Sequence, residues 1–250
     1  MTAAAVRVDV PTGHRPLPAE WFRPEAEQAP GVLVLHEVFG LNDDIRRICR
    51  RFAEKGYHAV APDLYRGAHW ARCSMGALAA LRFRDGGQPA DDLEAALQWM
   101  EAQPAITAAG AVGFCLGGGF ALCLGTRGTA KVAGGFYGDV PTRQRMAEHM
   151  CPVLGGYGGR DRLFASQGAR LKSDLDELGV PNDVVVYPDA GHSFMGDAGH
   201  PVLAALSAPL MAVSYNEAAA EDSWRRMLEF FAVHLQPSGE PSTEHAGTPS

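Results

Sequence analysis

One cysteine lies where an enzyme would hold a nucleophile. Cys115 is the centre of residues 113–117 (Gly-Phe-Cys-Leu-Gly), which follow a short apolar segment and precede a helix-like apolar run. A strand, Gly-x-Cys-x-Gly and a helix form the layout of a nucleophile elbow, a sharp turn whose tip residue stands above the start of the helix. Glycine on both sides lets the main chain approach itself closely. A thiol at a helix N-terminus ionises readily because the helix dipole favours the anion, so we predict a thiol nucleophile.

A nucleophilic thiol needs a base and an acid that orients the base, and two downstream loops offer them. Asp161 ends the segment 158–161 (Gly-Gly-Arg-Asp), and His192 lies in 189–194 (Asp-Ala-Gly-His-Ser-Phe). The order nucleophile, acid, histidine is the chain order of α/β-hydrolases. Asp189 and Asp197 compete for the acid role, but the place of Asp161 directly after an expected strand favours it. Asp189 is expected to shape the turn before His192.

Each of these residues also has a structural interpretation. Cysteine is among the most buried residue types, and a histidine after a strand is commonly a loop or packing residue. Glycine-rich turns between a strand and a helix occur in nucleotide-binding folds as well. The combination in one order favours the catalytic interpretation.

Acyl transfer also requires an oxyanion hole, which is a pair of N–H groups aimed at the developing negative charge. The residue after the nucleophile supplies one donor, here Leu116. The loop after an early strand supplies the other. That loop is residues 36–40 (His-Glu-Val-Phe-Gly), and we choose the Val38 N–H.

Strands and helices alternate through most of the chain, which favours a single α/β domain with a mostly parallel sheet covered on both faces. Ligand sites in such sheets lie beyond the carboxyl ends of the strands, where all the residues named so far fall. We expect the strand before Cys115 and others at 6–10 (an edge strand), 31–36, 57–61, 132–137, 152–157 and 183–187, and helices from Asn42 to Gly56, from Asp91, after Cys115, through Leu171 and from near Ala218.

Composition excludes several classes of protein. The 250 residues are 46% hydrophobic and carry a net charge of −7, so no basic field attracts nucleic acid or anionic lipid. No apolar run is long enough to span a bilayer, and the first residues lack a secretory signal. The five scattered cysteines form no CxxC pair, so neither a metal site nor a disulfide framework is expected, and free thiols favour the cytoplasm. The folded domain should cover residues 1–235, with 236–250 a disordered tail rich in Pro, Ser, Gly and Glu.

Several segments together resemble the dienelactone hydrolase family. They are 36–42 (His-Glu-Val-Phe-Gly-Leu-Asn), 61–65 (Ala-Pro-Asp-Leu-Tyr), 113–118, 158–161, 191–194 (Gly-His-Ser-Phe) and 215–219 with Trp224. The resemblance runs from about residue 6 to 235, and cysteine at the elbow is a feature of that family. It implies an α/β-hydrolase fold with Cys115 as nucleophile, His192 as base and Asp161 as orienting acid.

The same resemblance gives Glu37 a role, because it matches a family glutamate that helps to deprotonate the thiol when substrate binds. A carboxylate near the thiol can accept its proton, although it raises the thiol pKa while charged. The alternative is that Glu37 only pairs with an arginine at the pocket rim. We expect His36, its neighbour, to be structural.

The substrate is less defined than the chemistry. Family members that open anionic dienelactones hold the substrate carboxylate with arginines, but residues 193–197 after His192 contain none. Arg66, Arg72, Arg82 and Arg84 are available between residues 65 and 91 without a clean alignment to the family. We therefore expect no carboxylate clamp, and a neutral or different ester as the substrate. Phe39 and Tyr137 are expected to wall the pocket, with ordinary core packing as the alternative.

The sequence thus predicts a hydrolase that cleaves a small-molecule carboxylic ester or lactone through a Cys-His-Asp triad and a thioester acyl-enzyme. No metal or organic cofactor is expected, nor a nucleic-acid or membrane partner, and the protein should be a monomer or weak homodimer. A non-catalytic ligand-binding or redox-sensing protein that uses Cys115 is the main alternative. Hydrolysis of a peptide, amide or thioester is another.

Overall fold

A twisted eight-stranded sheet forms the centre of the computed structural model, which describes residues 4–83, 85–196 and 209–236. The spatial order is β1-β2-β4-β3-β5-β6-β7-β8. β1 and β2 pair antiparallel at one edge, and all the strands from β4 to β8 run parallel. The strands are β1 (Ala5–Val10), β2 (Leu17–Phe22), β3 (Ala29–Leu35), β4 (His58–Pro62), β5 (Ile106–Phe114), β6 (Ala133–Phe136), β7 (Val153–Gly158) and β8 (Asn182–Tyr187).

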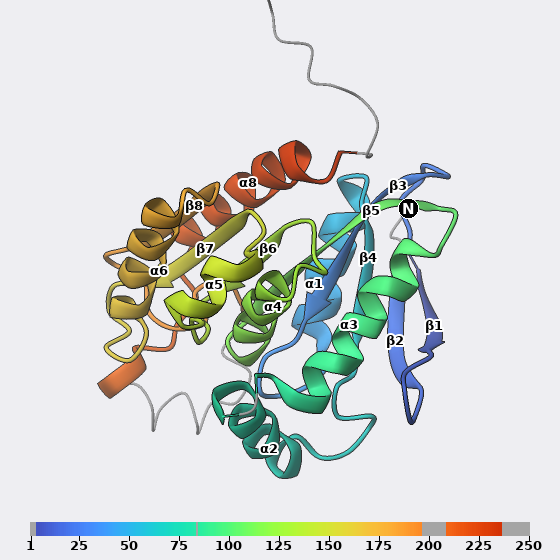
Figure 1. Cartoon of the computed structure of the whole chain (residues 1–250), viewed down its shortest axis with the longest axis horizontal. Helices are drawn as coiled ribbons and strands as arrows, with labels where there is room; N and C mark the ends of the chain where they lie inside the picture. Colours follow the sequence, from blue (N-terminus) through green and yellow to red (C-terminus); the bar gives the residue numbers. More distant parts are fainter. Residues whose placement is uncertain (1–3, 84, 197–208, 237–250) are drawn as a thin grey trace, which may run out of the picture.

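Helices cover both faces of the sheet, which explains why the central strands are apolar throughout. In β3, Val32 and Val34 face one core cluster, and Leu33 and Leu35 face the other. α1 and α8 pack on the first face, and α3 to α6 pack on the second (Figure 1). The helices are α1 (Asp43–Glu54), α2 (Trp70–Phe83), α3 (Gly87–Glu101), α4 (Leu116–Thr126), α5 (Arg143–His149), α6 (Ala165–Leu178) and α8 (Glu217–His234).

Two asparagines fix the helices that pack on the first face. The Asn42 side chain accepts a hydrogen bond from the Ile45 N–H (3.0 Å), and Asn216 accepts one from Ala219 (3.1 Å). α1 ends as predicted before Gly56, whose φ of 88° is the left-handed conformation that glycine adopts freely. The alternating strands and helices, the edge strand β1 and the mostly parallel sheet are all confirmed.

Other elements differ from expectation. β2, α2 and α5 were not predicted, and α3 begins at Gly87 instead of Asp91. Gly86 adopts φ of 80° at the cap of α3, and Pro89 falls in the first turn, where the missing N–H costs nothing. Asp197 and nearly all of the predicted tail lie outside the described residues. Within the described part of the chain, no helix is long and apolar enough to cross a membrane.

Candidate active site

The loops after four parallel strands meet at one edge of the sheet and bring the predicted residues together. The register pairs Leu35 with Gly113, and Phe114 with Phe136, so the ends of β3, β5 and β6 are level. Gly158 and Tyr187 end β7 and β8 opposite one another. Every catalytic candidate is on a loop that leaves this edge.

Cys115 occupies a strained turn between β5 and α4. Its φ of 53° and ψ of −116° lie outside the backbone regions that residues other than glycine prefer, which is typical of a functional turn. A Cβ on Gly113 would lie 2.0 Å from the Gly117 carbonyl oxygen, and one on Gly117 would lie 2.4 Å from that of Leu35. Only glycine fits at both positions, so the elbow predicted from the sequence is present.

His192 and Asp161 form a buried pair beside the elbow. The His192 Nδ1–H donates to Asp161 Oδ2 at 2.6 Å, and the two side chains are 4% and 0% exposed. The other Asp161 oxygen accepts from the Leu163 and Phe164 N–H groups at 3.1 and 3.3 Å. These bonds hold Asp161 as an oriented acceptor, whereas Asp189 is exposed.

The charge state of His192 follows from its neighbours. Burial alone would lower its pKa, but Cys115 and the Asp161 carboxylate outweigh burial and raise the pKa to about 10. With Nδ1 bonded to Asp161, the second nitrogen is the one free to exchange a proton with the thiol. That nitrogen, Nε2, is buried, and the interaction of His192 with Cys115 is one of the causes of the raised pKa.

Glu37 is buried beside this pair and is bonded to hydroxyl groups. The Ser193 hydroxyl donates to Glu37 Oε1 at 3.1 Å, and Tyr137 hydrogen-bonds the same carboxyl group. Burial raises the pKa of Glu37 despite these hydrogen bonds and the nearby His192. Within the described residues Glu37 forms no ion pair with an arginine, so the proposed pairing at the pocket rim is not seen.

The aromatic candidates occupy different surroundings. Tyr137 is fully buried with φ of 42°, and its ring centre lies 5.0 Å from that of His192. Phe39 is half-buried and packs edge to face on Trp70 of α2, with ring centres 5.3 Å apart. Tyr137 therefore forms part of the wall around His192 and Glu37, and Phe39 links the loop 36–40 to α2.

The loop 36–40 and the start of α4 hold the two N–H groups that the sequence predicts as oxyanion donors. Leu116 is the first residue of α4, so its N–H has no partner within the helix. Val38 lies in a turn in which the Gly40 N–H donates to the Glu37 carbonyl at 3.2 Å.

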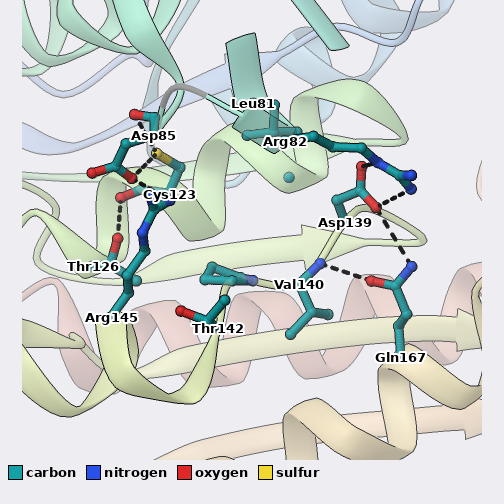
Figure 2. Close-up of a pocket in the computed structure, with 12 residues that line it drawn as sticks. Leu81, Arg82, Asp85, Cys123, Thr126, Asp139, Val140, Thr142, Arg145 and Gln167 are labelled. Atoms are coloured by element: carbon teal, nitrogen blue, oxygen red, sulfur yellow. Dashed lines mark hydrogen bonds and ion pairs between the residues drawn. The ribbon is translucent and has the colours of Figure 1, made fainter. Parts of the chain in front are cut away.

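Two of the four arginines considered for a carboxylate clamp are held in ion pairs elsewhere. Arg66 pairs with the buried Asp92 at 2.7 Å, and Arg82 pairs with Asp139 at 2.8 Å. The second pair belongs to a separate pocket of about 390 Å³, in which Asp139 also faces Gln167 (Figure 2). Arg84 lies outside the described residues, and Arg72 is exposed on α2.

Sequence reasoning gave no role to two residues of this region. Ser193, which bonds Glu37, and Tyr65, whose hydroxyl bonds the loop 36–40, were present only as letters of the quoted motifs. The available signal in the sequence was position: Ser193 follows His192 directly, and Tyr65 lies just after the end of β4. Within the described residues, no group of three acidic, histidine or cysteine side chains could hold a metal ion.

The sheet order and the elbow define an α/β-hydrolase fold, and comparison with known proteins narrows the class. A model of the dienelactone hydrolase family matches residues 17–235. The chain is 31% identical over 252 residues to a Salmonella typhimurium protein named "Putative carboxymethylenebutenolidase", covering 90% of this chain and 86% of the relative. This chain therefore belongs to the dienelactone hydrolase family and is a hydrolase of that type.

Solved structures agree with this assignment. A Klebsiella pneumoniae protein described as a "Putative Dienelactone Hydrolase" superposes with a TM-score of 0.75 at 28% identity, covering 93% of this chain and 99% of its own. A dienelactone hydrolase-like promiscuous phosphotriesterase, P91 from metagenomic libraries, superposes with a TM-score of 0.80 at 26% identity. The match covers 94% of this chain and 100% of P91.

Proposed function

We propose that this protein hydrolyses a carboxylic ester or lactone through Cys115, His192 and Asp161. The observation that carries the proposal is the placement of His192 between a carboxylate and the thiol, with a pKa raised to about 10. A histidine held in this way accepts the thiol proton and stays charged beside the thiolate. Family membership supports the same reaction class.

The geometry supports the following sequence of steps. The Cys115 thiolate attacks the carbonyl carbon, and the oxyanion is bound by the N–H groups of Leu116 and Val38. The tetrahedral intermediate collapses, the carbon–oxygen bond of the ester breaks, and His192 donates its proton to the leaving alkoxide. A thioester remains. Water, deprotonated by His192, attacks the thioester and releases the acid, and the proton returns to the Cys115–His192 pair.

Glu37 gives the site a second proton acceptor. Burial raises the pKa of Glu37, so its carboxyl group takes up and releases a proton more readily near the working pH than an exposed carboxylate does. Such a group is suited to acid–base catalysis. Because Arg66 and Arg82 are paired elsewhere, we further propose that the substrate is a neutral ester or lactone rather than an anionic one. We expect catalysis by a monomer or weak homodimer, without a cofactor.

The test compares p-nitrophenyl acetate with cis- and trans-dienelactone for the wild type and Cys115→Ala. We expect turnover of the simple ester, and loss of that turnover to the uncatalysed background in Cys115→Ala. Cys123→Ala is the matched control, because Cys123 lies two turns further along α4 and its thiol contacts the Asp85 carbonyl. Its activity should stay within about twofold of the wild type.

Three outcomes separate the alternatives. Thiol-dependent turnover of the dienelactones would contradict the neutral-substrate proposal and retain the mechanism. Activity that survives in Cys115→Ala would overturn the mechanism. Oxidation of Cys115 by peroxide without hydrolysis of any activated ester would favour the redox-sensing alternative.

A further inference from the structure

The segment 61–65 at the end of β4 has no part in the steps above, yet it is tightly built. The Asp63 carboxylate accepts hydrogen bonds from the Tyr65 N–H (3.0 Å) and the Gly67 N–H (2.7 Å). A carboxylate bonded to N–H groups two and four residues ahead fixes a tight turn. The turn directs the Tyr65 ring at the loop 36–40.

Tyr65 contacts that loop in three ways. Its hydroxyl donates to the Val38 carbonyl at 3.0 Å. Its ring lies against Gly40, where a Cβ would come within 3.2 Å of it, and edge-on to His36 with ring centres 4.8 Å apart. Burial raises the pKa of Tyr65, so the phenol keeps its proton and remains a donor.

His36, the first residue of the loop, adds two further hydrogen bonds. Its Nδ1–H donates to the Glu37 carbonyl at 2.7 Å, and its Nε2 accepts from the Leu64 N–H at 3.3 Å. Burial lowers the pKa of His36, which favours the neutral ring that this donor and acceptor pair requires. Two neighbouring residues, Leu64 and Tyr65, therefore support the loop 36–40, one through His36 and one directly.

Together these bonds fix both peptide groups of Val38. The carbonyl of the Glu37–Val38 peptide points to His36 and to the Gly40 N–H, so the Val38 N–H of that trans peptide points the opposite way. The carbonyl of the next peptide is held by Tyr65. With both planes held, the dihedral angles of Val38 have little freedom left.

We propose that Tyr65 is a positioning residue for the oxyanion hole, acting through the Val38 peptide groups. This inference rests on the proposed function, in which the Val38 N–H binds the oxyanion. An oxyanion donor is effective only if it is held in place before charge develops, and removal of one donor costs about 10²–10³ in rate. Loosening a donor without removing it should cost less, on the order of tenfold.

The experiment is Tyr65→Phe, which keeps the ring contacts and deletes the hydroxyl. We expect kcat for p-nitrophenyl acetate to fall about tenfold with KM within about twofold. Inhibition by a trifluoromethyl ketone, whose tetrahedral adduct carries an oxyanion, should weaken by a similar factor. Alkylation of Cys115 by iodoacetamide forms no oxyanion, so its rate should match the wild type.

Tyr187→Phe is the matched control. Its hydroxyl donates to Asp222 at 2.9 Å and accepts from the Ser223 hydroxyl at 2.9 Å, between β8 and α8 and away from the loop 36–40. Tyr187→Phe should lose at least as much stability as Tyr65→Phe, and only Tyr65→Phe should lose kcat.

Unchanged kcat and unchanged ketone inhibition in Tyr65→Phe would overturn the inference alone. Equal losses in hydrolysis and in alkylation would also overturn it, because they would assign Tyr65 to the thiol or to folding. A wild type without thiol-dependent turnover would overturn the proposed function itself, which is a distinct result.

Discussion

Two buried histidines lie at opposite ends of the parallel strands, and they are similarly buried but differ in chemistry. His192 follows β8, at the carboxyl ends of the strands, and His58 begins β4, at their amino ends. Each is almost fully buried and uses Nδ1 in a hydrogen bond. Burial and a bonded Nδ1 are therefore not enough to identify a candidate catalytic histidine.

The partner of Nδ1 makes the difference. His192 donates to a carboxylate, whereas His58 Nδ1 accepts from the Trp21 indole N–H at 3.1 Å. An indole N–H only donates, so Nδ1 of His58 is the acceptor and the ring carries its proton on Nε2. Burial lowers the pKa of His58, and that of His192 is raised to about 10. One ring is held neutral and the other is held ready to carry charge.

The largest expected effect comes from changing the partner of His192. Asp161→Asn keeps the shape but replaces the acceptor that fixes the tautomer, so kcat/KM should fall by about 10³–10⁴. The measurement is ester hydrolysis at pH 7–8 with the fold checked by circular dichroism. Asp189→Asn is the matched control and should retain activity, because Asp189 is exposed. The opposite result for the two variants would transfer the acid role to Asp189.

The second effect is smaller and depends on pH. Glu37 accepts a proton only above its raised pKa, so wild-type activity should rise as the pH passes through that pKa. Glu37→Gln cannot titrate, and we expect it to lose this acidic limb of the kcat/KM profile together with about 10–10² in rate.

Ser193→Ala sharpens the same prediction. The Ser193 hydroxyl lowers the pKa of Glu37, so its removal should move the acidic limb to higher pH. A profile that is the same in wild type, Glu37→Gln and Ser193→Ala would remove Glu37 from the mechanism.

Local patterns predicted the elbow and most elements, because their causes lie within a few residues. Gly113 and Gly117 set the turn at Cys115, and Asn42 caps α1. β2 was missed because Pro18 weakens the pattern of a strand that pairs on both sides, and α5 has only seven residues. Capping signals and long periodic runs were what made the predicted elements recognisable, and α2 was missed as well.

The contacts within the site were less accessible to sequence reasoning than the identity of its residues. Tyr65 bonds a residue 27 positions away, and Ser193 bonds one 156 positions away. Such bonds follow from the spatial order of β3, β4 and β8, which composition and periodicity do not determine. The sequence could therefore name Glu37 but could not show that it bonds Ser193 and Tyr137 instead of an arginine.

The smallest expected effect concerns His58 and the pH dependence of folding stability. The folded state binds a proton on His58 less tightly than the unfolded chain, whose histidine titrates near 6.5. Above that pH both states are neutral and His58 has no influence on stability. As the pH falls below about 6.5, only the unfolded state takes the proton readily, so stability is lost. For His192 the sign is reversed: its contribution is present below about 6.5 and is lost as the pH rises toward 10.

His58→Gln keeps an acceptor for Trp21 and cannot titrate, so it should remove only the acidic loss. We expect the melting temperatures of wild type and variant to keep a constant difference from pH 7 to 8. That difference should shift in favour of the variant on going to pH 5, because only wild type loses stability as His58 of the unfolded chain takes up a proton. Hydrolysis at pH 8 should be unchanged. A parallel pair of curves from pH 5 to 8 would mean that His58 can be protonated in the folded protein, and the contrast with His192 would then rest on catalysis alone.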